Sequence, residues 1–432
     1  MNRHPTGAAT LLSSALCVVI LTFAPTYGVA EQPEQEVTLS QALDLLEKQN
    51  PDSLAARLQI AEAEAERIQA RLYQNPTIST DVNNFPVGHT TPGGLSVGQT
   101  IGSTVRLDQP LTLWGKRGLR IAGAEIGVAG AKEQARDTVR QLRAGVKDAF
   151  FRTLHDARLL AFVSENRARY RKVIELNERR FHSGDISEVE LSKIQLENLK
   201  FETDVEDARR SLGESQQLLG RLIGVEHLVV ASGELAAPNV AVDDVGLVDA
   251  AMDNRPDVAA LQRAREQADL ALQLARRERY PDITVGADYT HSEFVVSGDN
   301  RNIIGFGFSL PLPVLNQNQG EIAKAEVAMR QAENDLARLR LDIAQEVHDA
   351  LERYHSLQRV RQVFESGYLD RARLTVTAAE TSHRAGAASL IELLDAERTY
   401  TATQTDYLDT LFAARSSLNN LEKVIGKELA AD

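Results

Sequence analysis

The residues best suited to chemistry in this 432-residue chain are charged side chains that follow two glycine-containing turns. Glu392 and Asp395 lie three positions apart, so on a helix their carboxylates share one face. The corresponding positions of an earlier segment hold Glu190 and Lys193, where the second charge is reversed. On spacing alone, such a pair of charged residues indicates a solvent-exposed helix face. Whether the pair has a function depends on the helices that the two turns connect.

The histidines do not complete a metal site. His182 and His383 lie near the two turns, while His348 and His355 are seven residues apart on one helical stretch. None is accompanied by the two or three further ligands that specific metal binding requires. The sequence also has no nucleophile elbow and no phosphate-binding loop. We therefore expect no enzyme activity, no resident metal and no cofactor.

The N-terminal segment has the features of an export signal. An apolar stretch, Leu11–Phe23, follows a basic start and precedes the small residues Gly28-Val29-Ala30, so residues 1–30 are expected to be a cleaved signal peptide. The alternative is a membrane anchor, which requires about 18 or more apolar residues. The single cysteine, Cys17, lies inside this segment, so the exported chain can form no disulfide. The net charge of -13 argues against nucleic-acid binding and suits cationic solutes or basic partners.

One very long helix is the main element of the chain. From Trp114 to about Arg180 there is no proline, and apolar residues recur in steps of three and four. Such a helix would be roughly 100 Å long and needs partner helices to cover its apolar stripe. A turn at 181–187 reverses it, and a helix returns to about Leu222.

Two segments before the long helix alternate polar and apolar residues, as strands do. We expect strands at about 76–87 and 99–110, joined by a loop rich in glycine and proline. Helices precede them and end at Asn75-Pro76. Residues 31–37 are polar and are expected to lack regular structure.

The whole pattern then occurs a second time. Gly184 matches Gly386 at an offset of 202 residues, and Asn75-Pro76 matches Tyr280-Pro281 at an offset of 205. We expect two structural repeats, 31–224 and 247–432, with a linker at 225–246. The second repeat contains strands at about 281–296 and 303–311, a long helix from about Gln319 to His383, a turn at 383–389 and a return helix.

The strands have the alternation of outer-membrane barrel strands, as in the row Ile304, Phe306, Phe308 and Leu310. Four strands cannot close a barrel, and an open edge in lipid leaves backbone groups unpaired. If these strands span a membrane, several chains must share one barrel. The alternative is a small soluble sheet that caps a helical bundle.

Several segments resemble the TolC superfamily of outer-membrane efflux proteins. They are the two halves themselves, the segment Pro110–Arg117 with its Trp-Gly-Lys-Arg, the segment Pro311–Gly320, and the turn from Gly386 to Ala396. The two proline-led segments look most like the CzcC-type branch, which serves heavy-metal cation efflux. The resemblance implies a mainly α fold with a membrane β-barrel contribution: a homotrimer that shares a twelve-stranded barrel and a helical tunnel through the periplasm.

The resemblance also assigns roles at the two turns. It implies that Glu392 and Asp395 line a periplasmic gate, with Glu190 and Lys193 as their first-half counterparts. Rings of acidic side chains favour cations at a pore mouth. The turn residues expected to contact a periplasmic adaptor are Gly184, Ser187, Arg384, Gly386 and Ser389. Gly184 and Gly386 are expected to have positive φ, where glycine is least strained.

The function expected from this resemblance is a passive exit duct in the outer membrane of a Gram-negative bacterium. Divalent heavy-metal cations would be delivered to it by an inner-membrane pump, of the RND type, through a periplasmic adaptor protein. One alternative keeps the duct and changes the cargo to drugs or secreted polypeptides. A second alternative is a periplasmic coiled-coil adaptor. The expected partners are other copies of the chain, the adaptor, the pump and outer-membrane lipid, with no nucleic acid.

Overall fold

The computed structural model describes residues 35–87, 94, 96–242, 245–295 and 297–429. The expected signal peptide at 1–30 lies outside these residues. Helices make up most of the described chain, and strands form two small sheets. No described helix is both long enough and apolar enough to cross a lipid bilayer.

The elements follow one another in a similar order in the two halves of the chain. The first half contains β1 (Gln35–Val37), α1 (Leu39–Gln49), α2 (Pro51–Arg71), β2 (Thr77–Asn83), α3 (Val97–Thr100), β3 (Gly102–Leu111), α4 (Lys116–His182) and α5 (Glu188–Ile223). The remainder contains β4 (Val229–Ala231), α6 (Leu247–Asn254), α7 (Pro256–Glu278), β5 (Ile283–Ser292), β6 (Asn302–Ser309), α8 (Gln319–Val363), η1 (Phe364–Tyr368), α9 (Leu369–Arg384) and α10 (Leu390–Ile425).

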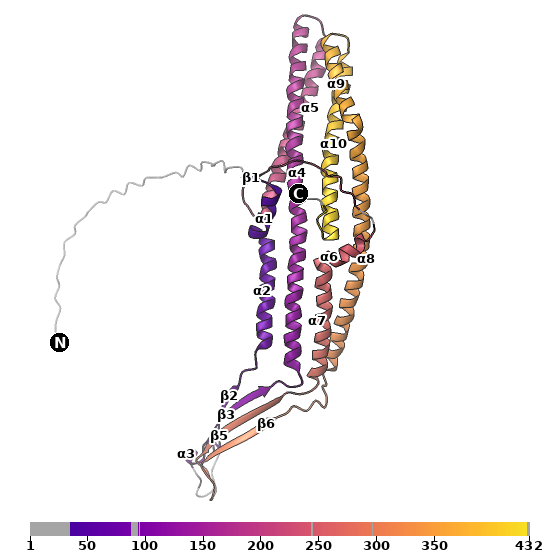
Figure 1. Ribbon diagram of the computed structural model, residues 1–432. Helices are drawn as coiled ribbons and strands as arrows, with labels where there is room; N and C mark the ends of the chain where they lie inside the picture. The colour runs from indigo at the N-terminus through magenta and orange to yellow at the C-terminus, as the bar shows by residue number, and fades with distance from the viewer. Residues whose placement is uncertain (1–34, 88–93, 95, 243–244, 296, 430–432) are drawn as a thin grey trace, which may run out of the picture. The chain divides into compact units, whose positions relative to one another are not determined.

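Helix α4 is the long helix expected from the sequence, and it contacts α2, α5, α7 and α10 along its length (Figure 1). Its apolar residues pack in clusters with these neighbours. One cluster joins Val146, Phe150 and Leu154 of α4 to α1 and α5. Another joins Val163 to Val205 of α5. The stripe of α4 is therefore covered within the same chain, as its periodicity requires.

Two expectations about element boundaries were wrong. The second long helix is not continuous from Gln319 to His383, because Gly367 has φ of +109° and Ser366 has ψ of 16° inside η1. A π-type insertion breaks the regular ladder of backbone hydrogen bonds there. The strand expected at 99–110 begins only at Gly102, since Val97–Thr100 form the short helix α3 behind the N-cap residue Ser96.

The larger sheet is antiparallel with the strand order β2-β3-β5-β6. The central pair, β3 and β5, comes from the two halves of the chain and places Val105 opposite Tyr289 and Arg106 opposite Asp288. Because successive side chains alternate between faces, this register separates apolar and polar residues. The sheet therefore has one apolar face and one polar face.

The smaller sheet shows that the expectation of no regular structure at 31–37 was wrong for residues 35–37, the part that the structure describes. β1 pairs in parallel with β4, which lies inside the expected linker 225–246. Val37 and Val229 are 1% and 0% exposed, and both belong to the core around α1 and α5. Burial of these apolar side chains outweighs the polar character of the short segment.

The Trp-Gly-Lys-Arg segment joins the larger sheet to α4 by docking on the second half of the chain. Trp114 donates its indole N–H to the carbonyl of Pro281 at 2.9 Å. Lys116, only 4% exposed, donates to the carbonyl of Tyr280 at 2.7 Å and pairs with Asp282 at 3.0 Å. A buried lysine needs such partners, so this contact fixes where α4 begins.

The two return helices, α5 and α10, each end in a glycine that contacts the junction between two earlier helices. For α5 this is the junction between α1 and α2, and for α10 it is the junction between α6 and α7. Gly224, which ends α5, has φ of +81°, and a Cβ atom on it would lie 2.7 Å from the backbone of Gln49. Gly426, which ends α10, has φ of +76°, and a Cβ atom would lie 3.2 Å from the backbone of Asn254. In the first half, Asn50 also donates to the carbonyl of Leu222 at 2.9 Å. These close approaches require glycine at both positions.

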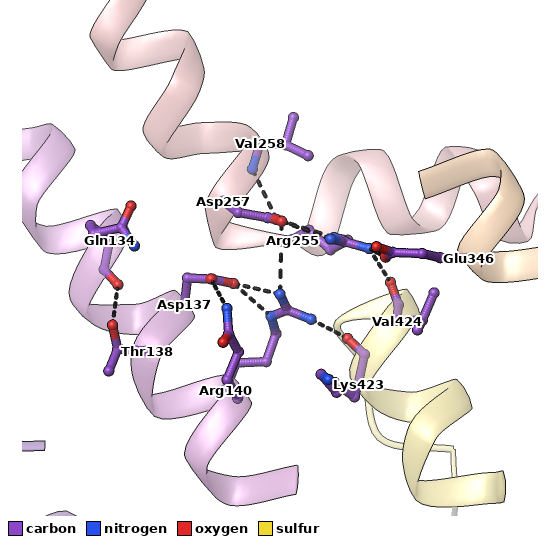
Figure 2. Close-up of polar contacts among 11 residues, drawn as sticks. Gln134, Asp137, Thr138, Arg140, Arg255, Asp257, Val258, Glu346, Lys423 and Val424 are labelled. Atoms are coloured by element: carbon purple, nitrogen blue, oxygen red, sulfur yellow. Dashed lines mark hydrogen bonds and ion pairs between the residues drawn. The ribbon is translucent and has the colours of Figure 1, made fainter. Parts of the chain in front are cut away.

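At the second of these joints, buried charges replace the single asparagine (Figure 2). Arg255 occupies the position equivalent to Asn50 and donates to Asp257 at 2.7 Å and to Glu346 at 2.5 Å. Arg140 of α4 binds Asp137 at 2.5 Å and donates to the carbonyl of Lys423 at the end of α10. Ion pairs thus join α4, α7 and α8, and hydrogen bonds to backbone carbonyls join them to the C-terminal end of α10.

Candidate functional site

Both turns have the same backbone hydrogen bonds. In the first turn, the N–H of Gly184 donates to Phe181 and that of Asp185 donates to Arg180, at 3.0 and 2.8 Å. In the second, Gly386 and Ala387 make the equivalent bonds at 3.0 and 2.8 Å, to His383 and Ser382. The predicted positive φ is confirmed, at +81° for Gly184 and +76° for Gly386. This is the Schellman arrangement, in which a left-handed residue ends the helix.

The two glutamates predicted to line a gate cap the helices that follow these turns. Glu392 accepts from the N–H of Ser389 at 2.8 Å, and Glu190 accepts from the N–H of Ser187 at 2.9 Å. Each serine hydroxyl in turn accepts from the glutamate N–H, which completes a capping box. The hydrogen bonds from these serines lower the pKa of Glu190 and of Glu392. Both side chains are therefore fixed, exposed anions at neutral pH.

Asp395 and Lys193 lie one helical turn further along, and both are exposed. Asp395 lies one turn beyond Glu392 on α10, as the spacing predicted. The charged side chain near Asp395 is Arg398. The main cause of the raised pKa of Arg398 is the hydrogen bond that it donates to Glu197. Arg398 and Glu197 join α10 to α5 by two bonds of 3.0 and 2.5 Å. This pair was not identified from the sequence, because its partners are 201 residues apart.

Arg180 connects the two turns to each other. From the last turn of α4 its guanidinium donates to the carbonyls of His383 and Arg384, at 3.2 and 3.0 Å. A pocket of ≈ 360 Å³ lies between the turns and is lined by residues that include Arg180, Glu190, His383 and Ser389. The side chain of Arg384 is exposed, so its backbone and not its charge makes the contact. This contact of Arg180 was not predicted from the sequence, because the only local indication of it is that Arg180 lies next to the first turn.

The histidines near the turns do not form a metal centre. His383 is buried, and its Nδ1 lies 3.1 Å from the carbonyl oxygen of Ala388, which fixes the turn. His182 is exposed. In the part of the chain that the structure describes, no group of three or more histidine, cysteine, aspartate or glutamate side chains is placed to hold a metal ion.

A buried carboxyl group lies on α10 just beyond Glu392 and Asp395. Glu397 is 3% exposed, and Arg169 of α4 lies 3.9 Å from its Oε2 atom. Burial, together with the neighbouring carboxyl of Glu380 on α9, raises the pKa of Glu397 to about 7. Ionisation of this side chain therefore works against the packing of α9 and α10.

We expect Glu397→Gln to flatten the dependence of stability on pH. The unfolded carboxyl ionises near pH 4.5 and the folded one near 7, so the wild type loses stability as the pH rises between these values. The substitution removes that titration, and thermal unfolding of the purified protein between about pH 5 and 7.5 measures the slope. Glu392→Gln is the control, because the pKa of Glu392 is lowered and lies below this window. Parallel slopes for the wild type and Glu397→Gln would contradict the prediction.

The amino-acid sequence matches one protein family in both halves. The sequence model described as outer membrane efflux protein matches residues 42–225 and 247–427. The cobalt-zinc-cadmium resistance protein CzcC of Cupriavidus metallidurans is 25% identical over 394 residues, which cover 90% of each chain. The nickel and cobalt resistance protein CnrC of the same organism is 26% identical over 320 residues, 73% of each chain.

Solved structures share the fold. A crystal structure of CusC superposes with a TM-score of 0.76 at 18% identity, covering 90% of this chain and 92% of that one. The outer membrane protein VceC of Vibrio cholerae gives a TM-score of 0.72 at 17% identity, covering 91% and 97%. The fold of this chain is therefore shared with these solved structures over about 90% of its length.

Proposed function

Because the chain belongs to the outer membrane efflux protein family, we propose that it is the passive exit duct of a tripartite efflux system for divalent heavy-metal cations. The family consists of outer-membrane channel proteins and not of enzymes. This membership removes the alternative of a periplasmic adaptor. In this proposal the adaptor and an inner-membrane pump deliver the cargo, and residues 31–224 and 247–432 are two structural repeats.

The larger sheet is the observation that carries the proposal. Its apolar face is exposed, with Phe306, Phe308 and Ile304 at 85%, 75% and 69%. Within the described residues, β2 and β6 each pair on one side only. In lipid, an apolar face is favourable but an unpaired strand edge is not. Three copies that join β6 of one to β2 of the next would close a twelve-stranded barrel and remove every edge.

The metal cargo is proposed from the similar proteins. CzcC and CnrC are named for resistance to cobalt, zinc, cadmium and nickel. Another similar protein, OpmQ of Pseudomonas putida, is named for pyoverdine export and is 25% identical over 334 residues. A duct of this family can therefore serve other cargo, and drugs or secreted polypeptides are the alternatives to metal ions.

Two experiments test the proposal. The purified protein, in planar bilayers, is expected to form discrete channels, and a protein that forms none would remove the duct. A deletion strain is expected to become sensitive to zinc, cobalt, cadmium or nickel salts, and the intact gene should restore growth. Sensitivity to detergents and dyes alone would replace the metal cargo with the alternative one.

At the gate, Glu392→Gln combined with Asp395→Asn is expected to lower the selectivity for cations over anions. Three chains would lose six carboxylates from the tunnel mouth, where rings of acidic side chains attract cations. Glutamine at position 392 can still complete the capping box, so the helix start is kept. The reversal potential in a salt gradient measures the effect.

The matched control is Asp249→Asn with Asp253→Asn, which removes the same two charges from the exposed side of α6. This control should keep the wild-type reversal potential. If the gate variant also keeps it, the selective constriction lies elsewhere than at Glu392 and Asp395.

A further inference from the structure

Three charged side chains gather on the polar face of the larger sheet. Arg106 of β3 places its Nε atom 2.9 Å from both carboxylate oxygens of Asp108. Its Nη1 atom lies 3.6 Å from Asp288 of β5, the residue directly opposite in the register. These side chains are about one-quarter to one-third exposed, at 36% for Arg106, 24% for Asp108 and 22% for Asp288. The cluster combines one positive and two negative charges.

Glycines on the two neighbouring strands leave room for this cluster. A Cβ atom on Gly286 would lie 2.2 Å from a carboxylate oxygen of Asp108, and one on Gly305 would lie 2.7 Å from a carboxylate oxygen of Asp288. Glycine inside a strand weakens it, and it is typical of places where another group must approach the backbone closely. The alternation of glycine with apolar residues on β6 thus has a physical reason: the charged side chains lie flat across the strands.

The apolar face of the larger sheet indicates which way the charged face points in a closed barrel. Most exposed apolar residues of the described strands occupy the other face of the sheet, and Ile303 alone among them lies on the charged face. Those on the other face are Ile78, Val82, Val105, Leu107, Leu111, Val285, Tyr289, Ile304, Phe306 and Phe308. In a closed barrel those residues must meet lipid, since a charged cluster on the lipid side would be costly. The face with Arg106, Asp108 and Asp288 then lines the channel.

We propose that Arg106, Asp108 and Asp288 form a second selectivity ring inside the strand-built part of the channel, distinct from the gate at the turns. This inference rests on the proposed duct. Each chain contributes a net charge of about -1 at this level, so three chains give about -3 and favour cations. Arg106 neutralises half of the negative charge, which lets cations enter without being held tightly. Conduction requires such a balance between entry and release.

The test compares charge variants of the full-length trimer in planar bilayers under a potassium chloride gradient. Arg106→Gln doubles the net negative charge of the ring, so the potassium-to-chloride permeability ratio is expected to rise about twofold or more. Asp108→Asn with Asp288→Asn makes the ring positive and is expected to lower the ratio below that of the wild type. Arg106→Lys keeps the charge and should keep the ratio.

Lys48→Gln is the matched control, because it removes one positive charge per chain from the exposed surface of α1. It should behave as the wild type. Channels that conduct but keep the wild-type selectivity in both Arg106→Gln and the double aspartate variant would overturn the ring and leave the duct intact. A wild-type protein that forms no channel would overturn the proposed function and the ring together.

Discussion

Replacing Gly224 with alanine is expected to destabilise the protein by about 3 kcal/mol or more, one of the two largest effects we predict for a single substitution. Two costs combine at this position. The backbone has φ of +81°, which an L side chain rarely adopts, and the new Cβ atom would lie 2.7 Å from the carbonyl group of Gln49. Backbone atoms at the end of α1 cannot move away without breaking the joint between α1, α2 and α5.

Other glycines of the chain separate the two costs. Gly184 has the same φ of +81°, but a Cβ atom added there would meet no neighbouring atom within 4 Å, so Gly184→Ala should show the strain alone, about 1 kcal/mol. Gly426→Ala, with its contact at 3.2 Å, should fall between the two. The thermal midpoint of each purified protein at one scan rate gives the order. A Gly224→Ala protein that melts like Gly184→Ala would show that the close approach is unimportant.

The second large effect is expected for Arg255→Met. Arg255 is 6% exposed and binds Asp257, Glu346 and the carbonyl of Val424 (Figure 2). Removing the guanidinium leaves the carboxylate of Asp257, 20% exposed, without its main partner, and breaking a buried pair costs about 3–5 kcal/mol. Asn50→Ala, at the equivalent joint of the first half, removes only neutral hydrogen bonds and should cost about 1–2 kcal/mol.

A second substitution tests whether the unpaired charge causes the loss. Arg255→Met combined with Asp257→Asn should be more stable than Arg255→Met alone, because the abandoned carboxylate is gone. If the double variant is less stable than the single one, lost packing and not lost charge pairing explains the effect. Thermal unfolding at pH 7 measures both.

The pH dependence has a defined sign at the same joint. Burial would raise the pKa of Asp257, but the hydrogen bonds and charge of Arg255, with that of Arg140, outweigh it and lower the pKa below 3.8. The stability that the Arg255–Asp257 pair contributes is therefore present at a pH above the pKa of Asp257 in the unfolded chain. It is lost as the pH falls below that pKa.

Much of the fold could be predicted from the sequence because its signals are local. The period of the apolar residues predicted α4, and alternation predicted the strands. Glycine after the last helical turn predicted the positive φ at Gly184 and Gly386. The serine and glutamate spacing of a capping box was also present in the sequence at 187–190 and 389–392, although we assigned those glutamates only to the gate.

Other features depended on contacts that no local pattern reports. β1 forms because Val37 reaches the core beside Val229, 192 residues away in the sequence. The break at η1 had one local signal, Gly367, whereas the equivalent position of α4 holds Glu165, a good helix former. Whether a glycine bends a helix is decided by packing around it, so the sequence alone left the second helix continuous.

The elements, their order in the two halves and the family resemblance follow from local patterns in the amino-acid sequence, because periodicity, caps and turns act over a few residues. The partner that each charged side chain meets depends on the tertiary structure. It placed Arg180 on the turn at 383–389, Arg398 on Glu197, and Arg106 between Asp108 and Asp288. Such contacts need an approach within about 4 Å, so most of these partners are set by the register of strands and helices that come from opposite halves of the chain.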